Sequence, residues 1–164
     1  MLAIVLGHGH GMRAGIGALY VAAATIPLWR TDVASLRLPN AIVLPGWAFA
    51  FTGVVGSALA TDAQGREALA GAAGPALFCV GAFALVHAAG GVGMGDVKLV
   101  ILLALALVPL AGAPLRLVLC FGGAVLAAGA VAWAALLHPA ASRVATLPFG
   151  PSLLGAFWLA AAAE

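Results

Sequence analysis

The chain has 164 residues, of which 65% are hydrophobic and only 7% are charged, and its formal net charge is +2. Soluble domains contain about 25% charged and about 45–50% apolar residues, so this composition excludes an ordinary soluble protein and indicates a membrane protein. The few basic residues are scattered along the chain, which is not the pattern of a nucleic-acid-binding protein.

Apolar stretches recur along the whole chain. A membrane-crossing helix needs about 20 mostly apolar residues, so six crossings take about 120 residues and leave only short connections. The sequence predicts an all-α, polytopic membrane protein with about six transmembrane helices and a single domain over residues 1–164, whose active site is built from helix ends on one face. The predicted spans are residues 14–29, 41–60, 68–89, 97–111, 115–137 and 145–163.

The connection after the first predicted span carries Asp32. Acids at a membrane interface are commonly paired with a nearby base, here Arg30 or Arg37, which is the structural alternative to a functional role. At the end of this connection, Pro39 favours an extended residue before it and Asn40 is a good helix cap, so together they predict the start of the second span.

The fourth predicted span is short and begins with the sequence Gly-Met-Gly-Asp-Val-Lys, residues 93–98. Asp96 could simply cap the helix, since aspartate is favoured there. A cap does not need glycines around it, whereas Gly93 and Gly95 remove side chains so that backbone or substrate can approach the carboxylate. Acids at membrane depth are costly and mark functional sites, so we interpret Asp96 as catalytic. Lys98 either extends to the interface or favours the ionised form of a neighbouring acid.

Six spans place successive connections on alternating faces of the membrane. Asp32 and Asp96 then share one face because two spans separate them, whereas Asp62, in the polar loop after the second span, lies on the other. The face with Asp32 and Asp96 carries a small excess of basic residues, which favours a cytoplasmic location. These are Arg30, Arg37, Lys98 and Arg143, against Arg13, Arg66 and Arg116 on the other face.

Two aspartates on one face are the groups that peptide hydrolysis requires without a metal or a nucleophilic side chain. Close carboxyls do not both ionise easily and tend to share one proton. The ionised member takes a proton from water, which attacks the scissile carbonyl, and the protonated member donates to the carbonyl oxygen and then to the leaving amine. Irregular backbone between helices can line the water-filled cavity that such a site needs. The pair predicts an intramembrane aspartyl protease.

Other chemistries have less support in the sequence. Residues 93–98 lack the Gly-Lys-Ser/Thr ending of a phosphate-binding loop, and Cys79 and Cys120 form no Cys-x-x-Cys pair. We therefore predict no metal and no cofactor. His87, at the end of the third span, is interpreted as an interfacial histidine rather than a proton shuttle.

Residues 147–151, Leu-Pro-Phe-Gly-Pro, open the last predicted span on the same face as the two aspartates. Proline is common in the first turn of a helix, so this segment is either an ordinary helix start or a corner that positions substrate. The residues that we expect to shape the site or position substrate are Gly93, Gly95, Lys98, Pro39, Asn40, Pro148, Phe149 and Gly150.

Three of these segments together resemble the type IV prepilin leader peptidases, a family of GxGD aspartyl proteases. Residues 93–99 resemble the GxGD signature, the stretch from Asp32 through Leu38-Pro39-Asn40 resembles the family's first catalytic segment, and residues 147–151 resemble its C-terminal Pro-Phe-Gly-Pro element. The resemblance covers about residues 29–154, with the three segments in the same order.

The resemblance implies a six-helix aspartic endopeptidase of the bacterial inner membrane, which removes the short basic leader of prepilins or pseudopilins at the cytoplasmic face. The motif match carries the catalytic role onto Asp32 and Asp96 only. Longer family members have paired Cys-x-x-Cys motifs and a methyltransferase activity, whereas this chain resembles the short, peptidase-only forms associated with Flp-type tight-adherence pili. The expected partners are the prepilin and the lipid bilayer, without nucleic acid.

Three alternatives stay open on the sequence alone. The first is another GxGD protease, such as a preflagellin peptidase. The second is a small ion- or proton-coupled transporter whose aspartates bind a cation or proton, although such acids are expected nearer the bilayer midplane in broken helices. The third is an inactive homologue that aids pilus assembly.

Overall fold

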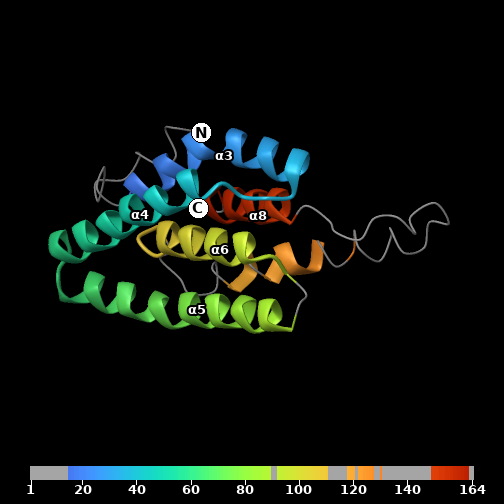
Figure 1. The fold of residues 1–164 in the computed structure, drawn as a ribbon. Coiled ribbons are helices and arrows are strands. Elements are labelled where there is room, and N and C mark those ends of the chain that lie inside the picture. The colour runs from blue at the N-terminus through green and yellow to red at the C-terminus, as the bar shows by residue number, and fades with distance from the viewer. Residues whose placement is uncertain are drawn as a thin grey trace.

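The computed structural model describes residues 15–89, 92–110, 118–120, 122–127, 130 and 149–162. Within these ranges every regular element is an α-helix and no strand occurs, which confirms the prediction of an all-α fold. Residues 118–120 and 122–127 are helical and belong to the orange part of the ribbon in Figure 1. The helices with defined bounds are α3 (Ile16–Ser35), α4 (Asn40–Ala60), α5 (Ala63–Ala88), α6 (Met94–Leu107) and α8 (Gly150–Ala162).

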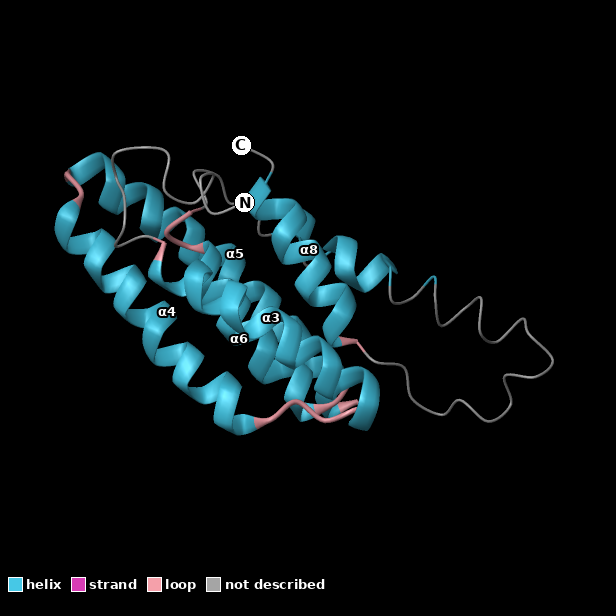
Figure 2. Cartoon of the chain, turned by 90° about the horizontal axis from the view of Figure 1, so that it is seen from above, coloured by secondary structure: helices cyan, strands magenta, loops and turns pink. Residues whose placement is uncertain are grey.

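Helix α6 is the centre of the bundle. It packs against α3, α4, α5 and α8, and its Val100, Leu102 and Leu103 side chains are fully buried. In Figure 2, α4 and α8 lie on opposite sides of α3. At about 1.5 Å per residue, the 14 residues of α6 extend about 21 Å, less than the ~30 Å hydrocarbon core of a bilayer. The short fourth span that the sequence predicts over 97–111 corresponds to α6, which is surrounded by other helices.

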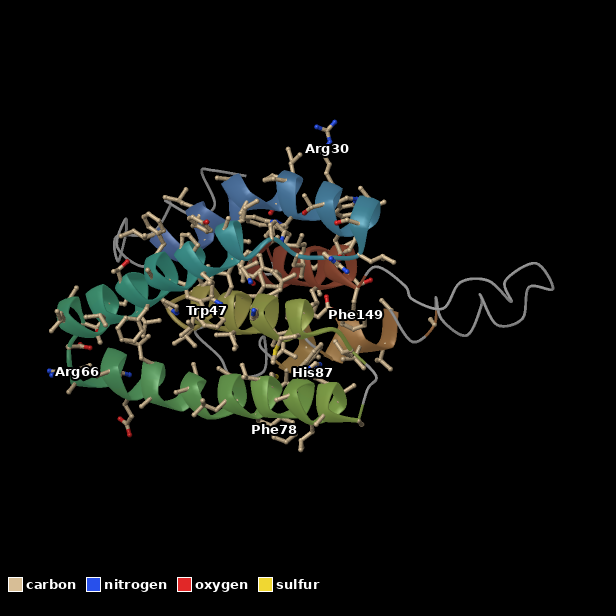
Figure 3. The ribbon with its side chains drawn as sticks, viewed as in Figure 1. Arg30, Trp47, Arg66, Phe78, His87 and Phe149 are labelled. Atoms are coloured by element: carbon tan, nitrogen blue, oxygen red, sulfur yellow. The ribbon has the colours of Figure 1, made fainter. Side chains whose placement is uncertain are left out.

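Helices α4 and α5, with 21 and 26 residues, are long and apolar enough to cross a membrane. Only 28% of the most apolar 18-residue stretch of α4, and 22% of that of α5, is buried in the protein. Large apolar side chains consequently face outward: Leu59 is 81% exposed, and Phe78, which points away from the bundle in Figure 3, is 74% exposed. A core helix of a soluble protein would bury such side chains.

The first described helix is longer than its apolar stretch. The sequence predicts a span over 14–29 followed by a connection that contains Asp32, whereas α3 continues to Ser35 and Asp32 lies in its last turn. The prediction was wrong because a drop in hydropathy marks where a segment leaves apolar surroundings, not where its backbone hydrogen bonding stops. The helix ends at Leu36, whose φ of 53° is left-handed and whose N–H donates to the Asp32 carbonyl.

The third predicted span, 68–89, also starts too late. Helix α5 begins at Ala63 because the Asp62 side chain caps it, accepting a hydrogen bond of 2.9 Å from a backbone N–H in the first turn. The predicted spans 115–137 and 145–163 lie partly outside the described ranges. The described part of the first is helical, and α8, which begins at Gly150, accounts for the second.

A glycine lets α3 approach α4 and α6 closely. A Cβ atom on Gly17 would lie 3.0 Å from the Ala50 Cα and 3.2 Å from the Ala106 Cα, and these are backbone atoms that cannot rotate away. Small residues at such contacts favour helix packing in membranes. The Tyr20 hydroxyl, which donates to the Ile42 carbonyl at 2.6 Å, is a second link between α3 and α4.

We predict that Gly17→Ala lowers the free energy of unfolding by about 1–3 kcal/mol, the usual cost of overpacking, because α3 must move away from its neighbours. Gly71→Ala is the matched control, since a Cβ on Gly71 of α5 meets nothing within 4 Å and alanine is the better helix former. Thermal unfolding in detergent, followed by tryptophan fluorescence, compares the two variants. Equal midpoints would contradict the close packing of α3.

Candidate active site

Several described helices have one end in a common region. Helices α3 and α5 end, and α6 and α8 begin, on the right-hand side of Figure 1, whereas the turn between α4 and α5 lies at the far left. Asp32 in the last turn of α3 and Asp96 in the first turn of α6 belong to the common region. Asp62 lies in the turn between α4 and α5, so it is at the opposite end of the bundle from the other two aspartates.

Asp32 joins the end of α3 to the start of α8. Its side chain is only 4% exposed, and its Oδ2 atom accepts a hydrogen bond of 2.9 Å from the backbone N–H of Gly150. Gly150 is the first residue of α8, and a Cβ atom on it would lie 2.8 Å from the same Oδ2. The absence of a side chain at position 150 therefore allows the two helix ends to meet at this carboxyl.

Asp96 lies three residues after the N-cap of α6, which is Gly93, so the interpretation of Asp96 as the cap itself does not hold. Its carboxyl instead interacts with the Gly93 backbone N–H, as an acid at this position of a capping box does. A Cβ atom on Gly93 would lie 3.3 Å from the Asp96 Oδ2. One on Gly95 would lie 3.2 Å from the Leu38 Cβ, so Gly95 allows the connection after α3 to pack over the start of α6.

The two carboxyls interact electrostatically. Burial raises the pKa of Asp96 to about 6, with a further contribution from the negative charge of Asp32 and a smaller opposing one from the Gly93 N–H. Burial also raises the pKa of Asp32, opposed by the Gly150 hydrogen bond. Asp32 at the end of α3 and Asp96 at the start of α6 thus lie in the same region of the bundle, on two helices in contact. Both lie outside the stretches 14–29 and 97–111 predicted to cross the membrane.

Lys98 connects the start of α6 to α4. Its Nζ donates to the Asn40 Oδ1 at 3.0 Å, and its backbone carbonyl accepts a 3.0 Å hydrogen bond from the Trp47 Nε1. The expected helix cap at Asn40 was wrong: Pro39 is the N-cap and Asn40 is the first residue of α4, which frees its side chain for Lys98. The sequence did not indicate a role for Trp47, because its hydrogen-bond partner is a backbone carbonyl in α6, which no sequence pattern marks.

His87 holds the connection between α5 and α6. Its Nδ1 lies 2.8 Å from the Val92 carbonyl oxygen, and because a carbonyl only accepts, this ring nitrogen carries the proton. Figure 3 shows the imidazole on the side of α5 that faces α6. The contact fixes the backbone just before Gly93, which is a structural role.

Phe149 and Gly150 lie at the start of α8, whereas Pro148 lies outside the described residues. The Phe149 ring packs edge-on against Phe83 of α5, with ring centroids 5.8 Å apart. This contact fixes the approach of α8 to the bundle, next to the amide that binds Asp32. No feature of the sequence singled out Phe83, which resembles any other aromatic residue in an apolar span.

An apolar cavity of about 410 Å³ lies between residues 119–127 and α8, and its lining contains neither aspartate. In the part of the chain that the structure describes, no three His, Cys, Asp or Glu side chains gather as a metal site would need. The chemical groups of the described site are therefore two carboxyls and the backbone N–H groups that face them.

Comparisons with protein-family models, with curated proteins and with solved structures found no match to this chain.

The raised pKa of Asp96 predicts how stability depends on pH. Because the folded pKa of about 6 exceeds the ordinary 3.8, the folded protein binds more protons than the unfolded chain in this window, and stability falls as the pH rises through it. Asp96→Asn should reduce this loss of stability with rising pH. The loss that remains comes from Asp32, whose pKa is also raised. Thermal unfolding in detergent between about pH 4 and pH 7 measures the slope. Identical slopes in wild type and variant would contradict the raised pKa.

Proposed function

We propose that the protein is an aspartic endopeptidase that cleaves the short basic leader of type IV, Flp-type prepilins or pseudopilins at the cytoplasmic face of the bacterial inner membrane. The observation that carries the proposal is the position of Asp32 and Asp96 at the same end of the bundle, in the last turn of α3 and the first turn of α6, two helices in contact. Burial raises the pKa of Asp96 to about 6, and the charge of Asp32 contributes to the rise. The prepilin substrate and the bacterial location rest on the resemblance of the three sequence segments.

The chemistry follows from a pair of carboxyls that share one proton. The ionised carboxyl takes a proton from a water molecule, whose oxygen then bonds to the scissile carbonyl carbon. The protonated carboxyl gives its proton to the carbonyl oxygen and stabilises the tetrahedral intermediate. The carbon–nitrogen bond breaks as the pair returns a proton to the leaving amine, so no metal or cofactor enters the reaction.

The outward-facing apolar surface of α4 and α5 supports a location in the bilayer. Exposed apolar patches of this extent on a monomer mark a membrane or protein interaction site. We propose that these helices cross the membrane as part of a bundle of six spans. The short, central α6 then begins at the membrane face, outside the crossing part of the bundle, where water can reach the carboxyls.

We predict that Asp32→Asn and Asp96→Asn each lower prepilin cleavage by at least about 100-fold, since each removes a group that transfers protons. Cleavage is measured by co-expression with a Flp-type prepilin, with the leader followed by gel shift and mass spectrometry. Asp62→Asn is the control and should cleave as wild type does, because Asp62 caps α5 at the other end of the bundle.

Cleavage that survives either substitution would contradict the carboxyl pair. Wild-type protein that cleaves none of several prepilins would contradict the peptidase and favour the transporter or the inactive homologue.

The proposed orientation puts the end of the bundle with Asp32 and Asp96 on the cytoplasmic side. Arg37 and Gln64 are both exposed and lie at opposite ends, and the native Cys79 and Cys120 are buried. In sealed inverted membrane vesicles, a membrane-impermeant maleimide should label Arg37→Cys and not Gln64→Cys, with the reverse result in spheroplasts. Labelling of both variants from the same side would contradict the proposed crossing of α4.

A further inference from the structure

Helix α8 contributes a backbone group to the site. The N–H of Gly150, its first residue, donates to the Oδ2 of the buried Asp32 at 2.9 Å. The first N–H groups of a helix have no partner within the helix and form the positive end of its dipole. A hydrogen bond from such a group favours the ionised form of a carboxyl.

The place of Asp32 in its own helix makes this bond important. Asp32 lies in the last turn of α3, where the negative end of the helix dipole disfavours a carboxylate, and burial disfavours it as well. The neighbouring bases Arg30 and Arg37 are exposed, and Figure 3 shows Arg30 pointing away from the bundle. Among the described contacts of Asp32, the Gly150 amide is the one that favours its charge.

Contact distances explain why glycine occupies position 150. A Cβ atom there would lie 2.8 Å from the Asp32 Oδ2 and 3.1 Å from its Cγ, distances at which the carboxyl must move. The corresponding contact at Gly93 is milder, because a Cβ would lie 3.3 Å from the Asp96 Oδ2. A side chain at position 150 therefore separates Asp32 from its amide donor. A side chain at position 93 requires only a small shift of Asp96.

We propose that Gly150 is a positioning residue that holds Asp32 as the ionised carboxyl, so that Asp32 is the general base and Asp96 the general acid. This inference rests on the proposed peptidase function. Asp32 takes a proton from water as the water oxygen bonds to the carbonyl carbon, and Asp96 protonates the carbonyl oxygen. Asp32 then gives its proton to the leaving nitrogen as the carbon–nitrogen bond breaks, and a hydroxyl of the intermediate returns a proton to Asp96.

Among the residues that the structure describes, the other titratable groups near the pair are bonded elsewhere or exposed. Lys98 of α6 donates to Asn40, and His87 of α5 bonds to the Val92 carbonyl. Arg37, in the connection after α3, is exposed. The first two turns of α4 and of α8 contain no titratable side chain. The pH dependence of the reaction should therefore report mainly on the two carboxyls, the acid limb on Asp32 and the alkaline limb on Asp96.

The test is the pH profile of kcat/KM for purified protein in detergent, acting on a synthetic prepilin. Gly150→Ala should move the acid limb of kcat/KM up by about one pH unit, since Asp32 loses the bond that favours its charge, and should therefore lower kcat/KM by about tenfold at pH values below that limb. Gly155→Ala, in the same helix, is the control and should match wild type, because its Cβ meets nothing within 4 Å.

Three results would overturn the assignment: an unchanged profile for Gly150→Ala, a loss of rate with both limbs in place, or a shift of the alkaline limb alone. A second measurement does not depend on this variant folding or on cleavage. Carboxyl ¹³C NMR of the wild type, assigned with Asp32→Asn and Asp96→Asn, should show the first ionisation of the pair mainly on Asp32. Ionisation mainly on Asp96 would overturn the inference even if prepilin is cleaved. Wild type that cleaves no prepilin while Asp32 ionises first would contradict the peptidase alone.

Discussion

The hydrogen bond between the Gly150 amide and the Asp32 carboxyl is the constraint on which the site depends. It joins the end of the first described helix to the start of the last, and it does so in a buried position where a carboxyl without a partner would be costly. The bond requires a helix N-terminus without a side chain, which only glycine provides. The first and last described helices thus meet at the proposed catalytic site.

The second carboxyl depends on the central helix. Helix α6 is held by α3, α4, α5 and α8, so Asp96 in its first turn has a fixed place relative to Asp32. The Lys98 contacts to α4 and the His87 contact before Gly93 restrict the same helix start. Protein contacts from these four helices surround α6, which at 14 residues is shorter than a bilayer is thick.

Much of this arrangement could be predicted from the sequence because hydropathy and connection counting reflect strong constraints. The second span, 41–60, agrees with α4 to within a residue, and Asp62 was separated from the other two aspartates by counting spans alone. The end of α3 could not be predicted this way, because Arg30, Thr31 and Asp32 interrupt the apolar stretch while the backbone stays helical to Ser35. The contacts of Lys98 with Asn40 and Trp47 depend on how two helices pack, which no local pattern encodes.

The central claim is that Asp32 and Asp96 act on each other as one unit, and the most direct measurement of this is the pKa of Asp96 with and without the charge on Asp32. Carboxyl ¹³C NMR in detergent gives both values, in wild type and in Asp32→Asn. The account predicts a pKa of about 6 in the wild type and a lower value in the variant, because one of the causes of the rise is removed. An unchanged pKa of Asp96 would contradict the shared site.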